Sequence, residues 1–344
     1  MDCELLHDTL RRGSRFAALI VAALIAPAAQ AAVIISSDAT QNMTCANGVC
    51  APTASKAVLN AGDLETLLAS GSVEVTTTGE DIQARDITIK APVTWSSGSV
   101  LTLDAQKSIA VDRPISISGL AGLTVVTNDG SRKGTFEFGP KGNVTFANLA
   151  STLSIDGVAY TLAGDIKTLA SDILSDPGGD FALANSYDAS GDGTYHSSPI
   201  GTFGGTFEGL GNTVSNLSID GPGQDQYGGL TEGLFAEIER TGTVRNIAVA
   251  SANVAVPAHT DLGDVEGGAV LAGENFGTLQ SCVATGSVAS GRHTRRSGPA
   301  TGGLVGINEG RISQSGAAVR VTARVFNAGG LVGFNAYSGN IRTC

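Results

Sequence analysis

Residues 302–312 read Gly-Gly-Leu-Val-Gly-Ile-Asn-Glu-Gly-Arg-Ile, and residues 329–335 repeat the first part as Gly-Gly-Leu-Val-Gly-Phe-Asn. Weaker copies lie at residues 271–279 and 233–244. Self-similarity at a period of about 20–50 residues is typical of stacked repeats. Each copy has a short apolar run, glycines at a turn and a second apolar run, so one unit cannot bury its own apolar face. We therefore expect the strands of successive repeats to stack on one another.

Alignment of the repeats gives columns of similar side chains. The first column is aliphatic and contains Val244, Leu279, Ile312 and Ile341. The second, three residues later, contains Ile247, Cys282, Ser315 and Cys344. The third contains Val249, Ala284 and Ala317. Such columns are expected where successive coils stack inside a solenoid, with glycines where the backbone needs a positive φ or where coils approach closely.

The repeated element, with its following Gly-x-Ile, resembles the GLUG motif of large bacterial surface and secreted proteins. Residues 203–217 resemble the Gly-x-Phe-x-Gly element that commonly precedes such motifs. The resemblance covers residues 160–344, while residues 32–159 resemble, with less specific motifs, the filamentous-haemagglutinin-like β-helical adhesins. It implies a right-handed parallel β-helix exported to the cell surface. Ala236 departs from the pattern because it replaces the glycine expected after Gly-Leu-Phe.

Composition limits the classes of function. The chain has 344 residues, 46 of them glycine, with 5% aromatic residues and a net charge of −11. Many glycines and few aromatics suit thin stacked coils better than a thick globular core. The acidic balance argues against nucleic acid as the main partner, because phosphate neutralisation needs a basic surface.

The first 31 residues have the pattern of a secretory signal peptide. Arg11, Arg12 and Arg15 precede an apolar core at residues 16–26, and Ala-Gln-Ala at residues 29–31 suits cleavage. A transmembrane anchor is the alternative, but the apolar core is shorter than the roughly 18–20 residues that a bilayer requires. We therefore divide the chain into a signal peptide (1–31), an N-terminal β-rich haemagglutinin-like solenoid region (32–159) and a GLUG-repeat β-helix region (160–344).

Two pairs of cysteines lead to different expectations. Cys45 and Cys50 flank an Asn-Gly turn, so a local disulfide is expected in an exported chain, with metal binding as the rival. Cys282 and Cys344 are two coils apart in one column, about 9–10 Å at strand spacing. This exceeds the roughly 7 Å limit for a disulfide, so both are expected to be unpaired and to face inward.

The remaining local pattern is β, with two helical segments. Residues 73–146 contain short alternating apolar runs separated by turn residues, which also suits a sandwich or barrel; the repeat columns favour parallel coils. Helical spacing occurs at residues 61–69 and again behind Asp165, before Pro177. The apolar face of the second segment contains Ile166, Leu169, Ala170, Ile173 and Leu174. We expect a short amphipathic helix on the flank of the solenoid, with a partner-binding helix as the alternative.

Candidate chemistry is sparse. Asp188 and Asp192 lie in an oxygen-rich, glycine-containing run that partly resembles a calcium loop and is also ordinary turn chemistry. Glu232, Glu237 and Glu239 could act on a glycosidic bond only if two of them faced each other across a cleft; scattered solvated acids are the alternative. We predict no catalytic residues, no cofactor and no metal beyond this weak calcium candidate.

A basic loop stands out on the acidic chain. It contains Arg292, His293, Arg295 and Arg296. Its side chains either contact an acidic glycan or surface polymer or form a solvated loop between coils. Loops on a rigid solenoid are frequent binding sites.

These observations predict an all-β, non-catalytic passenger or stalk of a secreted bacterial adhesin at the cell surface, associated with the outer membrane. Its partners would be host or environmental glycans or surface proteins. A β-helical polysaccharide-degrading enzyme and a structural spacer are the alternatives. The chain ends within a repeat, at residues 341–344, which predicts a fragment of a longer protein with an outer-membrane export partner or barrel not contained in this chain.

Overall fold

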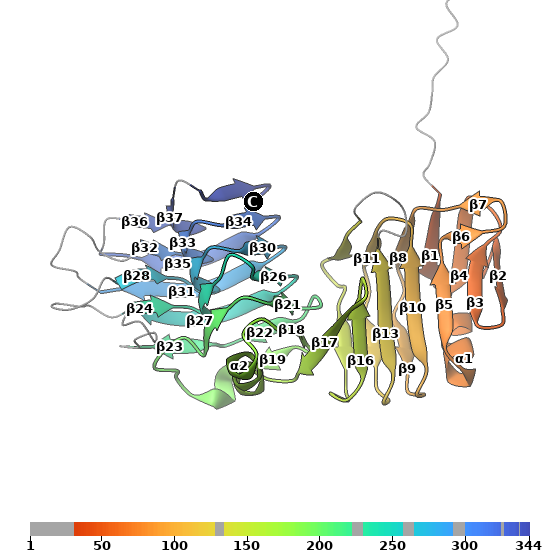
Figure 1. Cartoon of the computed structure of the whole chain (residues 1–344), viewed down its shortest axis with the longest axis horizontal. Helices are drawn as coiled ribbons and strands as arrows, with labels where there is room; N and C mark the ends of the chain where they lie inside the picture. Colours follow the sequence, from red (N-terminus) through yellow and green to blue (C-terminus); the bar gives the residue numbers. More distant parts are fainter. Residues whose placement is uncertain are drawn as a thin grey trace, which may run out of the picture. The chain divides into compact units, whose positions relative to one another are not determined.

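The computed structural model describes residues 31–127, 134–221, 230–256, 265–291, 300–324, 327–336 and 338–344. They belong to one compact unit built mainly from strands, with two α-helices (Figure 1). The chain is therefore all-β in class. None of the helices in this part of the chain is long and apolar enough to span a bilayer. Residues 1–30 of the predicted signal peptide lie outside the described residues.

In the N-terminal region, residues 31–159, most strands pair in parallel. One sheet has the order β14-β11-β8-β1-β4, a second has the order β15-β12-β9, and a long sheet begins with β2-β3-β5-β10-β13-β16. The hairpins β2-β3 and β6-β7 are antiparallel. The strand bounds are β1 (Ala32–Ser36), β2 (Met43–Ala46), β3 (Val49–Pro52), β4 (Lys56–Asn60), β5 (Val73–Thr76), β6 (Thr78–Gly79), β7 (Ile82–Gln83), β8 (Asp86–Ile89), β9 (Val93–Trp95), β10 (Val100–Ala105), β11 (Ile109–Val111), β12 (Ile115–Ile117), β13 (Gly122–Thr127), β14 (Phe136–Phe138), β15 (Val144–Phe146) and β16 (Thr152–Ile155).

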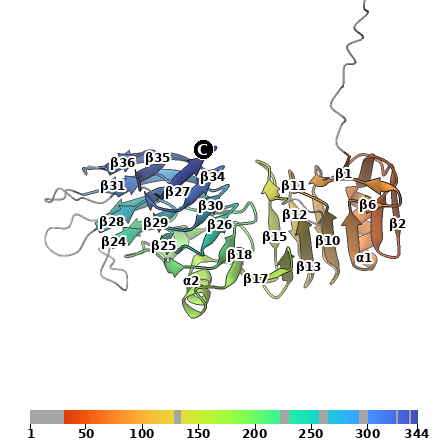
Figure 2. The same cartoon turned by 45° about the horizontal axis from the view of Figure 1, so that its top comes forward.

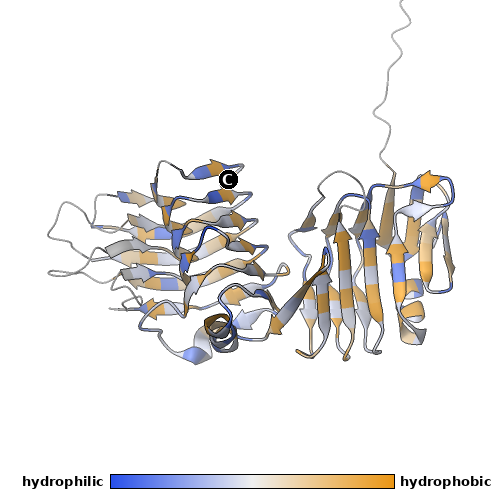
Figure 3. Ribbon diagram, viewed as in Figure 1, coloured by the Kyte–Doolittle hydropathy of each residue, from blue (hydrophilic) through white to orange (hydrophobic). Residues whose placement is uncertain are grey.

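Alternation of apolar and polar residues determines which side of each strand is buried. In β10 every second residue is buried, and Figure 3 shows the corresponding bands along the strands of this region. Leu103 lies in register with Val75 on one side and with Val125 on the other, and all three are fully buried. Because side chains alternate between the two faces of a strand, parallel register stacks the apolar residues into continuous ladders.

In the repeat region, residues 160–344, the strands fall into four parallel sheets. Sheet I continues the long sheet as β17-β18-β21-β26-β30-β34-β38, and sheet II has the order β19-β22-β27-β31-β35, with β23 also paired to β27. Sheet III has the order β24-β28-β32-β36, and sheet IV has the order β20-β25-β29-β33-β37. The strand bounds are β17 (Val158–Ala163), β18 (Asp180–Leu183), β19 (Tyr187–Asp188), β20 (Ile200–Phe203), β21 (Thr206–Glu208), β22 (Thr213–Ser215), β23 (Ser218–Asp220), β24 (Leu230–Glu232), β25 (Phe235–Ile238), β26 (Thr243–Arg245), β27 (Ala248–Val256), β28 (Val265–Gly268), β29 (Ala272–Asn275), β30 (Thr278–Gln280), β31 (Val283–Ser290), β32 (Ala300–Gly302), β33 (Val305–Asn308), β34 (Arg311–Ser313), β35 (Gly316–Thr322), β36 (Asn327–Gly329), β37 (Val332–Asn335) and β38 (Asn340–Arg342).

From β24 onward, successive repeats contribute one strand to each sheet in the same order. The chain passes from β26 in sheet I to β27 in sheet II, β28 in sheet III and β29 in sheet IV, and then returns to sheet I at β30. The stacking of β28 on β24 and of β29 on β25 can be followed in Figure 2. The first column aligned from the sequence is confirmed, because Val244 pairs with Leu279, Leu279 with Ile312 and Ile312 with Ile341.

Glycine recurs in the motif because sheets III and IV approach closely. A Cβ atom on Gly306 would lie 2.5 Å from both the backbone nitrogen of Gly268 and the carbonyl oxygen of Gly273. The clash is with the backbone of the preceding repeat, so no rotamer change could relieve it. Ala236 occupies the same column in the first repeat, where sheet III has no earlier strand. The departure of Ala236 from the motif is explained by this missing neighbour.

The asparagine of the motif forms a ladder that is buried at Asn275 and Asn308 and exposed at its last member, Asn335. The Nδ2 of Asn275 donates to the Oδ1 of Asn308 at 2.7 Å, and the Nδ2 of Asn308 donates to the Oδ1 of Asn335 at 2.7 Å. The ladder ends where Asn335 donates to the carbonyl oxygen of Gly339. Buried amides require such partners, so each asparagine fixes its neighbours in register.

The second column follows a recurring backbone corner. Asn246, Ser281, Gln314 and Thr343 have φ values of 57°, 54°, 51° and 55°. This left-handed conformation turns the chain inward just before the column that contains Cys282 and Cys344. Cys282 is unpaired and buried, as predicted. Cys344 is unpaired but exposed, so the prediction that it faces inward was wrong: no further described strand covers the last repeat.

Two helices border the sheets. Helix α1 (Ala61–Ser70) starts at Asn60, whose side chain accepts hydrogen bonds from two backbone N–H groups, and it buries Leu64 and Leu68. Helix α2 (Ile166–Ser175) starts at Asp165 and buries Ile166, Leu169 and Ile173. Leu174 was predicted on the buried face of α2 but is 84% exposed. The packed face is therefore narrower than the sequence spacing suggested.

Candidate functional site

A groove of about 560 Å³ lies between helix α2 and the first strands of sheets III and IV. The helix supplies an apolar wall, and Glu237 and Glu239 of strand β25 and the turn after it supply acidic groups. The complete lining is Ala170, Ser171, Ile173, Leu174, Pro177, Ser197, Ser198, Pro199, Gly201, Thr202, Thr231, Ala236, Glu237 and Glu239. A concavity of this size is within the usual range for ligand pockets.

The groove exists because one strand of the repeat pattern is missing. Between β19 of sheet II and β20 of sheet IV the chain forms a short 3₁₀ turn (Ala189–Asp192) and a connection, without a strand in sheet III. Residues 197–199 of this connection line the groove beside β24 instead. The hydroxyl of Ser198 donates to the carbonyl oxygen of Thr231 at 2.9 Å and accepts from the backbone N–H of Gly233 at 3.0 Å. A single side chain thus makes two hydrogen bonds at the edge of β24.

The three glutamates considered as candidates for glycoside hydrolysis lie in different environments. Glu232 is fully buried and is not part of the groove lining, whereas Glu237 and Glu239 line it. Glu237 and Glu239 are two residues apart on one stretch of chain, so they belong to the same wall. The lining contains no carboxylate on the helix wall opposite them. Among the described residues, the lining thus does not place two carboxylates on facing walls, the arrangement that acid–base hydrolysis of a glycoside uses.

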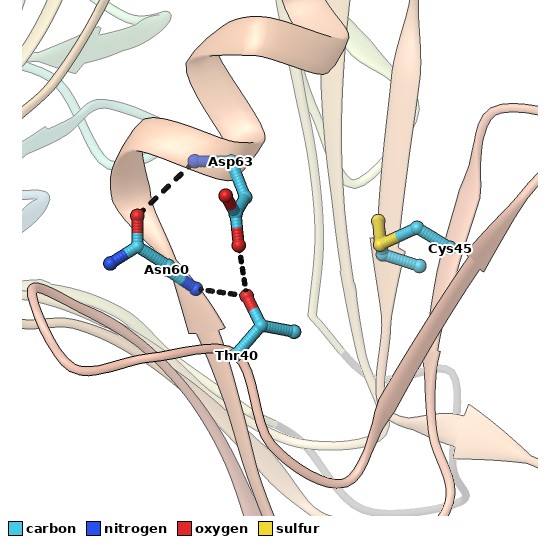
Figure 4. Close-up of a disulfide and its surroundings, with 5 residues drawn as sticks. Thr40, Cys45, Asn60 and Asp63 are labelled. Carbon is cyan, nitrogen blue, oxygen red and sulfur yellow. Dashed lines mark hydrogen bonds between the residues drawn. A yellow bond between two sulfur atoms is a disulfide. The ribbon is translucent and has the colours of Figure 1, made fainter.

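The cysteine pair at the Asn-Gly turn forms a disulfide. Cys45 and Cys50 lie opposite each other in the hairpin β2-β3 and are bonded to each other. Beside them a smaller hollow of about 320 Å³ separates the hairpin from α1. Figure 4 shows how Thr40 ties this edge to the helix: its hydroxyl donates to Asp63 and accepts from the backbone N–H of Asn60. The disulfide and the hydrogen bonds of Thr40 both stabilise the start of the stack of strands.

The calcium candidates are held by protein groups. Asp192 accepts hydrogen bonds from the hydroxyls of Tyr187 and Tyr195, both at 2.7 Å, and pairs with Lys167 at 3.2 Å. Burial alone would raise the pKa of Asp192, but these hydrogen bonds outweigh it and lower the pKa. Asp188 accepts from Ser190 and Asn216, which lowers its pKa. Turn chemistry accounts for this run, and no group of three or more His, Cys, Asp or Glu within the described ranges could hold a metal ion.

The basic loop lies outside the described residues. Arg292, His293, Arg295 and Arg296 belong to the connection between β31 and β32. The corresponding connections in neighbouring repeats join β27 to β28 and β35 to β36, so they also run from sheet II to sheet III. The sequence of this connection changes from repeat to repeat, while the strands before it pair in parallel, with one register shift between Val249 and Ala252 of β27.

Comparisons with known proteins are limited. No protein-family model and no solved structure matches the chain. Over 206 residues, 59% of the chain, it is 27% identical to halomucin of Haloquadratum walsbyi (strain DSM 16790 / HBSQ001). The chain spans 2% of the length of halomucin, so the similarity concerns a small part of a far longer protein.

A buried ion pair was missed by the sequence analysis. Arg245 donates to Glu208 at 2.6 Å and to the hydroxyl of Tyr160 at 3.1 Å, and Asn246 donates to Glu208 and to the carbonyl oxygen of Phe136. Burial raises the pKa of Glu208, although Arg245 and the hydrogen bonds oppose this. Glu208 and Arg245 directly follow Phe207 and the column member Val244, which pair with each other in β21 and β26. The aligned columns began at Val244, so adding residues 206–208 as one more copy would have been needed to place these opposite charges side by side.

Proposed function

We propose that this chain is a non-catalytic passenger or stalk of a secreted bacterial cell-surface adhesin, built as a right-handed parallel β-helix of GLUG-type repeats. The observation that carries the proposal is the repeated path through four parallel sheets, with side chains in register from repeat to repeat. The right-handed sense rests on the strong preference of parallel strand connections for that hand. The similarity to halomucin, of which the chain spans 2% of the length, supports a place within a far longer protein.

Attachment is assigned to the connections between sheets II and III. Strands in register form a rigid support, and connections of variable sequence on such a support are suited to binding. The basic loop of Arg292, His293, Arg295 and Arg296 would contact acidic groups of a glycan or of a surface protein. The loop interrupts an otherwise acidic chain, so it would concentrate positive charge at one place.

A binding screen tests this function. The secreted chain is applied to a glycan array and to host cells, together with an Arg292/Arg295/Arg296→Ala variant. An Arg311/Arg320/Arg324→Ala variant is the matched control, because it removes the same charge from exposed positions. We expect the unchanged chain to bind saturably. The first variant should bind with an affinity about tenfold or more lower, and the affinity of the control variant should stay within about twofold of the unchanged chain. Equal loss in both variants would indicate unspecific charge attraction, and no binding by the folded chain would favour a structural spacer.

A polysaccharide-degrading enzyme is the second candidate because Glu237 and Glu239 line a groove. Incubation with acidic and neutral polysaccharides, followed by measurement of reducing ends, tests it. Cleavage that disappears in both Glu237→Gln and Glu239→Gln would establish the enzyme and overturn the non-catalytic proposal. We expect no cleavage, since both carboxylates belong to one wall.

A further inference from the structure

The groove beside α2 occupies the position of a strand that the repeat pattern requires. Sheet III begins at β24, whereas sheets I, II and IV each have an earlier strand, in β18, β19 and β20. The outer edge of β24 therefore has no strand beside it: residues 197–199 lie there, and the edge borders the groove at Thr231. An open strand edge is a template on which an extended peptide can add by main-chain hydrogen bonds.

Ser198 marks where such bonds would form. Its hydroxyl bonds both to the carbonyl oxygen of Thr231 and to the N–H of Gly233, two residues apart along β24 and its turn. A parallel strand presents an N–H and a carbonyl at this spacing. Ser198 thus makes two hydrogen bonds of the kind that an added strand would make, and such a strand would displace Ser198 together with the short segment 197–199 that carries it.

The walls of the groove specify the chemistry of the occupant. On α2, Leu174 is 84% exposed and lies with Ile173 and Pro177 along one side, which suits an apolar side chain. On the other side Glu239 is exposed, and the lining includes Glu237 but no Lys, Arg or His. An acidic wall facing an apolar wall is complementary to a segment that carries both basic and apolar side chains.

We propose that this groove binds a basic, extended peptide segment of a partner protein, which adds to sheet III as a strand beside β24. The main chain of the peptide replaces the Ser198 hydroxyl at Thr231 and Gly233. One apolar side chain packs on Leu174, and a Lys or Arg side chain reaches Glu239. This site is separate from the basic loop, which would attract acidic groups, and it does not depend on adhesion through that loop.

Peptide titration with the full chain tests the proposal. The probe is a fluorescent nine-residue peptide that alternates Lys and Val, and the control probe has Glu at every Lys position. Binding is followed by fluorescence anisotropy. We expect saturable binding of the basic probe alone, weakened about fivefold or more by Leu174→Ser and by Glu239→Gln. Matched control variants are Leu149→Ser and Glu309→Gln, which change an exposed leucine and a glutamate outside the groove.

Two further measurements distinguish strand addition from simple charge attraction. Ser198→Ala removes the competing hydroxyl, so the basic peptide should bind about three- to tenfold more tightly. A peptide with alternate backbone nitrogens methylated should lose most of its affinity, because it cannot form the ladder. Equal binding of the methylated peptide, or an unchanged affinity in Ser198→Ala, would overturn strand addition.

The remaining outcomes are also decisive. If Leu174→Ser and Glu239→Gln bind the peptide as well as their control variants do, the peptide lies elsewhere and the proposal fails. If spermidine competes fully at its own saturating concentration while apolar substitutions in the peptide have no effect, the groove is a site for small organic cations. A failed glycan screen would leave these results unaffected, so the two proposals fail separately.

Discussion

The N-terminal region and the repeat region both stack parallel strands, but different side chains occupy their interiors. In the N-terminal region the ladders are mainly aliphatic, with Trp95, Phe136 and Phe146 among them, and the buried polar residues that the structure describes there are all serine or threonine. In the repeat region the buried polar residues include Glu208, Asn212, Asn275 and Asn308. Aliphatic ladders tolerate exchange among Val, Ile and Leu, whereas glycine contacts and asparagine ladders require one residue type at one position. The second kind of interior therefore leaves a visible repeat in the sequence, and the first does not.

The largest expected effect lies where the two regions meet, at Glu208 and Arg245. Arg245→Met leaves a fully buried carboxylate without its cation, a change that typically costs about 3–5 kcal/mol. We expect the free energy of unfolding to fall by about 3 kcal/mol, the lower end of that range, because Arg245 itself is 29% exposed and partly solvated. Chemical denaturation at pH 7 measures this loss. In the double variant Glu208→Leu/Arg245→Met most of the loss should be recovered, since no unpaired charge remains.

The pH dependence of the Arg245→Met variant provides the control. Burial raises the pKa of Glu208, and without Arg245 this is opposed by the hydrogen bonds from Asn246 and from the backbone N–H of Leu210, with no positive charge beside it. A carboxyl whose folded pKa lies above its unfolded value of about 4.3 contributes stability below that value, which is lost as the pH rises through the folded pKa. The variant should therefore approach the wild type near pH 4. A deficit that is the same at pH 4 and pH 7 would show that packing, and not charge, accounts for it.

The next effect tests the glycine contacts of the repeat region. Gly306→Ala places a methyl group against the backbone of the preceding repeat, and we expect a loss of about 2–3 kcal/mol. Gly316→Ala is the matched control, since nothing lies within 4 Å of its added Cβ, and it should change stability by less than about 0.5 kcal/mol. Thermal unfolding of both variants measures the difference. Similar values for the two would mean that the glycine column reflects something other than close approach.

The sequence predicted the repeat region better than the N-terminal region because the interior of the repeat region requires one residue type at particular positions. The first column could be aligned because a shift of one residue would expose every aliphatic residue in it. In the N-terminal region Leu101 stacks on Leu123, but Val73 stacks on Leu101 over a longer interval that contains the β6-β7 hairpin, so the spacing is irregular. The strands there could be predicted and their partners could not.

The candidate site was largely beyond sequence reasoning. Its groove results from a strand that is missing, and a pattern search responds to residues that are present. Ala236 was the one signal, because it replaces a glycine that is needed only where an earlier strand of sheet III lies behind it. The exposure of Leu174 also depends on how far α2 rotates against β20, which helical spacing does not determine.

A smaller effect concerns the asparagine ladder. Asn308→Ala removes the central amide and leaves the Nδ2 of Asn275 and the Oδ1 of Asn335 without their partners. We expect a loss of about 1–2 kcal/mol in urea denaturation. Asn253→Ala, which breaks a bond to Ser287 at an exposed position, should cost less than about 0.5 kcal/mol. An equal effect at both positions would contradict a specific role for the buried ladder.

The smallest effect appears only in alkali, at the turn of Asp192. The hydrogen bond to Asp192 raises the pKa of Tyr187 to about 12, and burial together with the same carboxylate raises that of Tyr195. A tyrosine with a raised folded pKa contributes stability below its unfolded pKa of about 10, which is lost as the pH rises through the folded value. The unfolding midpoint of the wild type should therefore fall between pH 10 and 12. The fall should be larger than in a Tyr187→Phe/Tyr195→Phe variant, which lacks both hydroxyls and shows only the general loss of stability in alkali. Tyr160→Phe is a comparison: burial raises the pKa of Tyr160 as well, but its hydroxyl contacts Arg245 and not Asp192, so this variant should keep the part of the alkaline loss that depends on Asp192. If the double variant and the wild type lose stability in parallel over this range, the two hydroxyls do not hold Asp192 in solution, and the turn would again be open to the calcium hypothesis.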